Sequence, residues 1–313
     1  MKIAIFGAGA VGGYFGGRLA QAGEQVVFIA RGKHLQALQA SGLKVDSING
    51  DFIVQPVQAT DNPAEVGVVD VVIVAVKAWQ VPEAAAAMRP MVGPQTFVVP
   101  LQNGVDAPSQ LAAELGSEHV LGGLCGLWSF VVGPGHIQHA GIDPFVNFAE
   151  LDNRASERAE RLRQAFAQAN VKVEISPDIQ AAMWRKFLFI VSLSGMGSIT
   201  RSPIGVFRKL PETRKMLKEV MLEAFQVARA RHIDLPEDAV STTLAFIDGL
   251  PASGTASMQR DIMEGRPSEL EAQNGAVVRM GQETGVATPI NAFIYHSLLP
   301  MELRARGQIE FAV

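Results

Sequence analysis

Lys186 stands near the start of the stretch WRKFLFIVSLSGMG, residues 184–197, which is mostly apolar. The stretch is long enough for about three turns of helix. A lysine ammonium that meets a reacting oxygen can donate a proton and stabilise the negative charge that develops there. Ile190 and Ser194 follow at i+4 and i+8, so in a helix the three side chains share one face. The alternative is a lysine on a core helix that extends its charge into water.

Ser257 and Glu269 form a second pair of candidates, in the segment 257–291. Gly265 and Pro267 between them imply a bend that could bring both side chains to one site. A carboxylate there can orient a lysine ammonium and accept a hydrogen bond from a substrate or ribose hydroxyl. Considered alone, Glu269 is more typical of a solvated surface.

A glycine-rich turn near the start of the chain predicts a dinucleotide site. Its six residues are Gly7, Ala8, Gly9, Ala10, Val11 and Gly12. The turn follows a strand pattern and opens a helical pattern, which is the context that makes a GxGxxG match specific. Glycines allow a tight turn and a close approach to a pyrophosphate, and the helix N-terminus presents N–H groups to its charge. The alternative is a turn that serves only packing.

The end of the second strand pattern, QVVFIA, indicates the type of cofactor. NAD-binding proteins place an acid there for the ribose hydroxyl, whereas this chain has Arg31. A guanidinium can bind a 2′-phosphate through two hydrogen bonds, so the sequence favours NADPH; the alternative is a solvated loop arginine. Lys77 and Asn103 follow two later strand patterns. Because open α/β sheets bind ligands at the carboxyl ends of their strands, we expect both to contact cofactor or substrate.

Strand and helix patterns alternate through the first half of the chain, which predicts an α/β fold with a parallel, doubly wound Rossmann sheet. After about residue 120, a Gly-Pro-Gly turn between apolar runs predicts a few antiparallel strands at one edge of that sheet. From Pro177 onward long helical patterns take over. The predicted domains are residues 1–177, which bind NADPH, and the all-helical residues 178–313. Ser176 or Asp178 is expected to cap the helix of Lys186.

The composition is that of an ordinary globular protein of two domains, with 313 residues, 48% hydrophobic and 19% charged, and a formal net charge of −4. The lack of a basic surplus argues against nucleic acid as a partner. No run reaches the ~20 apolar residues of a membrane-spanning helix, and glycines interrupt the apolar stretch that a signal peptide needs. The one cysteine, Cys125, allows no internal disulfide and no cysteine-rich metal site. We therefore expect a cytoplasmic protein without a metal.

The chain resembles the ketopantoate reductase (2-dehydropantoate 2-reductase) family of pantothenate biosynthesis in five stretches: GAGAVGGYFGGRLA, VKAWQ, LQNGV, WRKF and the segment 257–291. They occur in the family's order along nearly the whole chain. The resemblance implies a Rossmann domain, a helical C-terminal domain and NADPH-dependent reduction of a 2-keto acid to a 2-hydroxy acid. It also implies that Arg31 and Lys77 lie on the cofactor side, and that the protein forms a homodimer as several relatives do.

The resemblance implies a role for each of four residues. Lys186 matches the lysine that protonates the carbonyl oxygen. Glu269 matches a glutamate of the active site, where it would serve catalysis and cofactor binding. Asn103 matches an asparagine near nicotinamide and substrate, and Ser257 matches a serine that helps to hold the substrate.

Two positions depart from the family pattern. Members that reduce ketopantoate typically carry asparagines where this chain has Ile190 and Ser194. Because isoleucine cannot replace the hydrogen bonds of an amide, these positions favour a less polar 2-keto acid. The alternatives are a 2-hydroxy acid or opine-type dehydrogenase and a regulator that binds NADPH without turnover. Lys186 and Glu269 argue against the regulator, because a sensor needs no proton donor.

Overall fold

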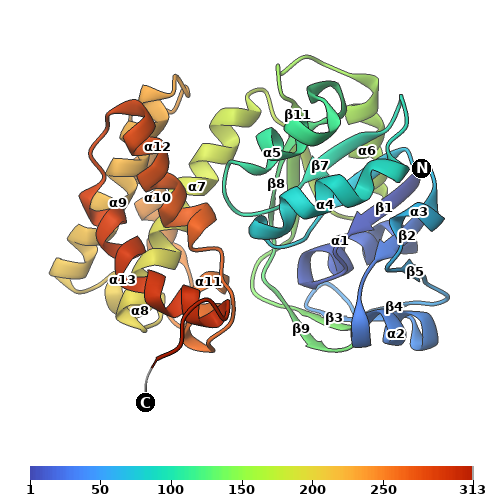
Figure 1. The fold of residues 1–313 in the computed structure, drawn as a ribbon, viewed down its shortest axis with the longest axis horizontal. Helices are drawn as coiled ribbons and strands as arrows, with labels where there is room; N and C mark the ends of the chain where they lie inside the picture. The colour runs from blue at the N-terminus through green and yellow to red at the C-terminus, as the bar shows by residue number, and fades with distance from the viewer. Residues whose placement is uncertain (312–313) are drawn as a thin grey trace. The chain divides into compact units, whose positions relative to one another are not determined.

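The structure is a computed structural model that describes residues 1–311, and its chain forms two compact units (Figure 1). The first unit comprises Met1–Gln102 and Asp106–Ile179. The second comprises Asn103–Val105 and the chain from Gln180 onward. Each unit has a hydrophobic core of its own. The short segment Asn103–Val105 therefore belongs to the core of the second unit, although the chain on either side of it belongs to the first.

A five-stranded, fully parallel sheet in the order β5-β2-β1-β6-β7 forms the centre of the first unit. Its strands are β1 (Lys2–Phe6), β2 (Gln25–Ile29), β5 (Gln58–Thr60), β6 (Val71–Val74) and β7 (Phe97–Pro100). Alternate residues of β1 enter different cores, with Ile3 and Ile5 in one and Ala4 and Phe6 in another. The sheet is thus covered on both faces, and the predicted doubly wound α/β fold is confirmed.

Helices cover the two faces of this sheet. They are α1 (Ala10–Gln21), α2 (Gly32–Ser41), α3 (Pro63–Val66), α4 (Val81–Met88), α5 (Ala107–Leu115) and α6 (Glu157–Gln168), with 3₁₀ turns at η1 (Ala78–Gln80), η2 (Arg89–Met91) and η3 (Ser117–His119). Side chains of α1 and α6 pack in the core that holds Ile3, and side chains of α4 and α5 pack in the core that holds Ala4.

The strands after residue 120 and the earlier strands β3 and β4 form two further sheets. One has the order β4-β3-β10-β9 and the other β12-β11-β8. Their strands are β3 (Leu43–Ser47), β4 (Phe52–Val54), β8 (Leu121–Gly126), β9 (Ser129–Gly133), β10 (His136–His139), β11 (Phe145–Glu150) and β12 (Lys172–Ile175). The prediction of antiparallel pairs is confirmed for β9 with β10 and β8 with β11. The predicted place at the edge of the main sheet holds for β8, since Val120 just before it forms a parallel bridge with Val98 of the edge strand β7, but it is wrong for β9 and β10. Because β10 pairs with β3 and packs on α1, its hairpin forms a separate layer.

The second unit is helical, as predicted. Its helices are α7 (Ile179–Thr200), whose first residue the first unit contributes, α8 (Ile204–Phe207), α9 (Pro211–Ala230), α10 (Ala239–Gly249), α11 (Ser257–Met263), the π-helical turn η4 (Glu271–Gly275), α12 (Ala276–Thr284) and α13 (Pro289–Ala305). They are coloured from yellow-green to red in Figure 1. Glu223 on α9 fixes the start of α13, because its carboxylate accepts the backbone N–H of Ile290 at 2.8 Å and of Asn291 at 2.9 Å. Within residues 1–311, no helix is both long and apolar enough to cross a membrane.

A side chain from elsewhere in the first unit binds the start of α7, because the backbone N–H of Ile179 donates to Oδ1 of Asn153 at 3.0 Å. Ser176, one of the two predicted caps, donates its hydroxyl to the carbonyl of Asp178 at 2.9 Å. The cap by Asp178 stays a prediction. A local capping pattern cannot reveal a partner that is 26 residues away in sequence.

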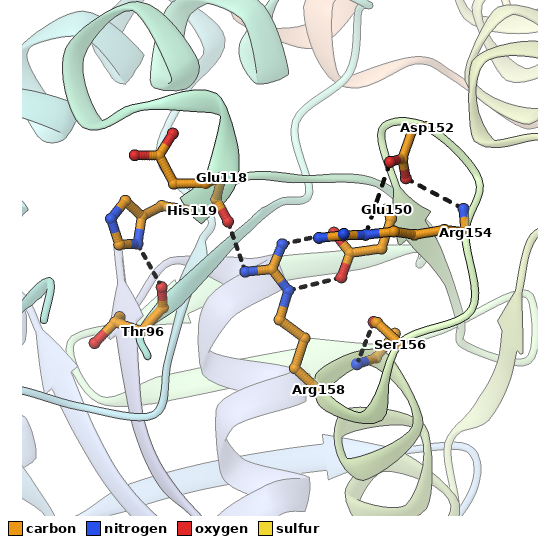
Figure 2. Close-up of polar contacts among 9 residues, drawn as sticks. Thr96, Glu118, His119, Glu150, Asp152, Arg154, Ser156 and Arg158 are labelled. Atoms are coloured by element: carbon orange, nitrogen blue, oxygen red, sulfur yellow. Dashed lines mark hydrogen bonds and ion pairs between the residues drawn. The ribbon is translucent and has the colours of Figure 1, made fainter. Parts of the chain in front are cut away.

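Glu150, at the end of β11, forms a buried ion pair that links several elements of the first unit (Figure 2). It is 3% exposed and accepts hydrogen bonds from Nε and Nη2 of Arg158, both at 2.6 Å. Nη1 of Arg158 donates to the carbonyl of Glu118 at 2.7 Å. Burial alone would raise the pKa of Glu150, but the hydrogen bonds from Arg158 and Ser156 and the charges of Arg158 and Arg154 outweigh it and lower the pKa.

We expect Glu150→Gln to reduce the free energy of unfolding at pH 7 by about 1.5–3 kcal/mol, the range for hydrogen bonds to charged groups. Because folding lowers this pKa, the stabilisation is complete above the ordinary value of 4.5 and is lost as the pH falls through the lower value of the folded state. Urea unfolding at a series of pH values tests this. Glu174→Gln, at an exposed position, is the control. An equal difference between Glu150→Gln and the unmodified protein at every acidic pH would contradict the prediction.

Candidate active site

The glycine turn joins β1 to α1, and close contacts require glycine at two of its positions. Gly7 has φ +101°, a conformation that favours glycine, and a Cβ there would lie 2.9 Å from backbone atoms of Ala75 and Val76. At Gly12 a Cβ would lie 2.0 Å from the carbonyl oxygen of Gly7. Gly9 caps α1 without any side-chain hydrogen bond. Gly7 and Gly12 thus pack the turn and helix against the sheet, while nothing lies within 4 Å of a Cβ at Gly9, and no side chain caps the helix N-terminus, so its N–H groups fit the charge of a dinucleotide.

His34 on α2 is close to this turn and was not identified from the sequence. Its Nδ1 accepts the backbone N–H of Gly135 at 3.2 Å. Burial lowers the pKa of His34, and a weaker interaction with the carbonyl of Ala8 raises it, with a net lowering. Nε2 of His34 forms no hydrogen bond of normal geometry, so its contact with the carbonyl of Ala8 is weak. A neutral His34 thus connects the β9–β10 turn to the neighbourhood of the glycine turn.

Arg31 and Lys77 follow parallel strands and therefore lie at the same edge of the sheet as the glycine turn. Arg31 is the N-cap residue of α2, and its Nη2 lies 3.2 Å from Oε1 of Glu83. Both side chains are about two-thirds exposed, at 66% and 65%. Such surface pairs contribute little stability, so the guanidinium can exchange Glu83 for another anion. Lys77 is half-buried and precedes η1.

Glu269 contacts another candidate residue within the second unit. It is 5% exposed, and its Oε2 accepts hydrogen bonds from Nδ2 of Asn103 at 3.5 Å and from Nε2 of Gln273 at 3.4 Å. Asn103 and Glu269 were both predicted as site residues, and the structure brings them together across 166 residues of sequence. Gln273 was missed, although its i+4 spacing from Glu269 on a helix could have indicated it.

The π-helical turn η4 begins two residues after Glu269. The N–H of Gly275 donates to the carbonyl of Leu270, five residues earlier, which widens the turn. Gln273 and Asn274 in this turn are fully buried, and Nδ2 of Asn274 donates to Oδ1 of Asn291 at 3.0 Å. Single π-helical turns of this kind occur often at functional sites. The turn places a buried amide next to a buried carboxylate.

The three candidates on α7 occupy one stripe of the helix, as predicted from their spacing. Lys186 and Ile190 are partly buried, and Ser194 is 1% exposed. Ser257 is the first residue of α11 and is half-buried. The predicted bend between Ser257 and Glu269 is present, because α11 ends at Met263 and Gly265 has φ +68°. The catalytic and substrate-binding roles of these residues stay predictions.

No group of three or more His, Cys, Asp or Glu side chains within residues 1–311 is arranged to hold a metal ion. Five buried polar side-chain atoms in the same range have no hydrogen-bond partner. They are Nε2 of His34, Oε1 of Gln102, Oγ of Ser198, Oε1 of Gln273 and Oδ1 of Asn274. Two of these five belong to η4, which sets this turn apart from the rest of the helical unit.

Comparison with known proteins identifies relatives along nearly the whole chain. The family model Ketopantoate reductase PanE/ApbA matches residues 3–153, and the model of its C-terminal part matches residues 178–302. A 2-dehydropantoate 2-reductase of Nostoc sp. is 30% identical over 314 residues, with 98% of each chain covered.

Solved structures give the same result. A PanE/ApbA family ketopantoate reductase from Ralstonia eutropha JMP134 superposes with a TM-score of 0.90 and 32% identity, over 98% of this chain and 100% of the other. A ternary structure of D-mandelate dehydrogenase with NADH and anilino(oxo)acetate also superposes with a TM-score of 0.90, at 25% identity, over 98% of this chain and 99% of the other. The family models cover both the unit with the glycine turn and the helical unit, and the relatives match over nearly the whole chain. The chain therefore belongs to the ketopantoate reductase family of NAD(P)-dependent oxidoreductases.

Proposed function

We propose that the protein reduces a 2-keto acid to a 2-hydroxy acid with NADPH, as a ketopantoate reductase or a close relative with a shifted substrate. The observation that carries this proposal is the buried Glu269 carboxylate with the amide of Asn103 bound to it. A carboxylate held beside an amide of the segment after β7 can orient a hydroxyl of substrate or ribose, which is the chemistry that the reduction requires. Membership of the family supports the same conclusion.

In the proposed reaction, different residues bind the cofactor, transfer the proton and orient the substrate. The dinucleotide, when bound, supplies the hydride, and the glycine turn with the N-terminus of α1 holds its pyrophosphate. The Lys186 ammonium holds a proton at Nζ and gives it to the substrate oxygen as negative charge develops there. Glu269 and Asn103 orient substrate or ribose hydroxyls, and Ser257 contributes a hydroxyl to the substrate. Location in the cytoplasm and a homodimer stay predictions of the sequence.

The substrate pocket that we propose is less polar than that of the ketopantoate enzymes. Ile190 would form an apolar wall beside Lys186, and the short hydroxyl of Ser194 is buried. A second candidate function follows, a 2-hydroxy acid dehydrogenase with an aromatic or branched substrate. The likeness to D-mandelate dehydrogenase bound to anilino(oxo)acetate supports this candidate. Consumption of NADPH with keto acids, compared with reduction of NADP with hydroxy acids, separates the two directions.

Arg31→Ala should remove most of the preference for NADPH over NADH. A charge-assisted hydrogen bond to the 2′-phosphate contributes about 1.5–3 kcal/mol, so the ratio of the two dissociation constants should change by roughly 10- to 150-fold. Fluorescence titration of both cofactors measures this ratio. Glu83→Gln is the control, because it removes the partner of Arg31 and should keep the preference. If the unmodified protein binds both cofactors equally, the assignment of Arg31 is wrong.

Lys186→Ala should lower kcat by roughly 10²- to 10⁴-fold and leave NADPH affinity nearly unchanged, because the variant loses a proton donor but no phosphate contact. Stopped-flow absorbance of NADPH measures the step. Arg185→Ala, at an exposed position on the same helix, is the matched control and should retain its activity. Normal turnover by Lys186→Ala would leave the lysine with the role of a surface charge.

The unmodified protein should reduce a branched or aromatic 2-keto acid that lacks the 4-hydroxyl group better than ketopantoate. A substrate hydroxyl that is desolvated without a partner costs about 1–3 kcal/mol, or roughly 5- to 150-fold in kcat/KM. Ile190→Asn should shift the ratio of kcat/KM values back toward ketopantoate, and adding Ser194→Asn should shift it further. Since Ser194 is buried, the single Ile190→Asn variant is measured first. A clear preference of the unmodified protein for ketopantoate would refute the apolar wall.

A further inference from the structure

Ser268, the residue before Glu269, is bound through all its polar atoms to Glu302 of α13 and to Arg306, which follows the last residue of α13. Ser268 is fully buried. Its N–H donates to Oε1 and Oε2 of Glu302 at 3.1 and 3.0 Å, and its hydroxyl donates to Oε2 at 2.5 Å. Its carbonyl accepts Nη2 of Arg306 at 3.1 Å. A segment 34 to 38 residues further along the chain therefore fixes the backbone next to Glu269.

Glu302 and Arg306 are themselves held by a tight ion pair. Nε of Arg306 lies 2.7 Å and Nη2 2.6 Å from Oε1 of Glu302. The side chain of Glu302 is 5% exposed and that of Arg306 is 24% exposed. A guanidinium fork that binds a carboxylate at this depth has little rotamer freedom, because a buried carboxylate without its partner is strongly unfavourable. The pair is thus a rigid anchor for Ser268.

The backbone on both sides of Glu269 is held in place by hydrogen bonds. Ser268 is bound by α13, and its hydroxyl accepts the N–H of Leu270 at 3.2 Å. The backbone that carries Glu269 is therefore fixed, and a change in it would move the carboxylate relative to the amides of Asn103 and Gln273, which lie 3.5 and 3.4 Å from it.

We propose that the Glu302–Arg306 pair is a positioning device for Glu269, acting through Ser268. This inference rests on the proposed function, in which Glu269 orients substrate or ribose hydroxyls. Neither Glu302 nor Arg306 touches a reacting group in this scheme. A misplacement of a catalytic group by about 1 Å can cost roughly 10²-fold in rate, so a loosened anchor should be visible in turnover.

The test compares two matched glutamates. In Glu302→Gln an amide NH₂ replaces one carboxylate oxygen and meets the donors of Ser268 or Arg306, so the anchor should loosen and kcat should fall roughly 10- to 100-fold. Glu150→Gln is the control, because its side chain is also nearly buried, at 4% exposed, and is paired with Arg158, at 22% exposed, through an equally short fork. We expect it to lose stability and keep its kcat. Equal kcat values for the two variants would overturn the proposal.

A double-mutant cycle distinguishes positioning from a general structural effect. If Glu302 acts through Glu269, adding Glu302→Gln to a Glu269→Gln background should lower kcat/KM by less than about threefold. Losses that multiply would show that Glu302 acts independently of Glu269, and the proposal would be wrong. If Glu302→Gln does not fold, Arg306→Lys replaces it in the same cycle. It keeps the charge beside Glu302 and loses the fork and the bond to the Ser268 carbonyl.

Amide hydrogen exchange separates failure of this proposal from failure of the proposed function. If no 2-keto acid is reduced by the unmodified protein, the proposed function fails. The anchor is then tested by exchange at the N–H groups of Ser268 and Leu270, which should become at least about tenfold faster in Glu302→Gln than in Glu150→Gln. Unchanged exchange at both amides would refute the anchor itself. If the protein reduces a 2-keto acid but the losses of kcat/KM in the double-mutant cycle multiply, the proposed function stands and the positioning role of Glu302 is refuted.

Discussion

A buried carboxylate requires hydrogen-bond donors, and much of the second unit supplies them to two such groups. Glu269 accepts the amides of Asn103 and Gln273, and Glu302 accepts Ser268 and Arg306. Removing a charge from water costs several kcal/mol unless partners replace the water, so the surrounding helices must be placed to satisfy these groups. Gln273 lies in the π-helical turn, and its i+4 spacing from Glu269 allows its side-chain amide to reach the carboxylate. The fold of this unit and the chemistry proposed for it thus depend on the same constraint.

Sequence patterns predicted the parts of the structure that depend on local periodicity. The parallel sheet followed from alternating strand and helix patterns, and the stripe on α7 from 3.6-residue spacing. Asn103 and Glu269 were each identified from their motifs. Their mutual contact was outside the reach of the sequence, because 166 residues separate them. The cap from Asn153 and the pairing of β10 with β3 are likewise products of tertiary packing.

Arg31 and Arg306 show how burial changes the meaning of the same side chain. Arg31 lies 3.2 Å from Glu83 with both groups largely in water, so this ion pair is weak and exchangeable. Arg306 lies 2.6 Å from Glu302, which is nearly buried, so that pair is effectively permanent. The first arrangement suits a group that must release one anion to bind another. The second suits a group that must not move.

The segment Asn103–Val105 has a consequence for how the gene can be divided. Because these residues belong to the second unit, while Asp106–Ile179 returns to the first, the helical unit is discontinuous in sequence. A fragment that starts at Gln180 would lack Asn103, one of the two amides bound to Glu269. During synthesis on the ribosome, Asn103 emerges 166 residues before Glu269, so the hydrogen bond between them can form only after most of the helical unit has been made. To transfer this helical unit to another Rossmann protein, one would therefore also have to replace a segment inside that protein's first domain with Asn103–Val105, which follows β7 here.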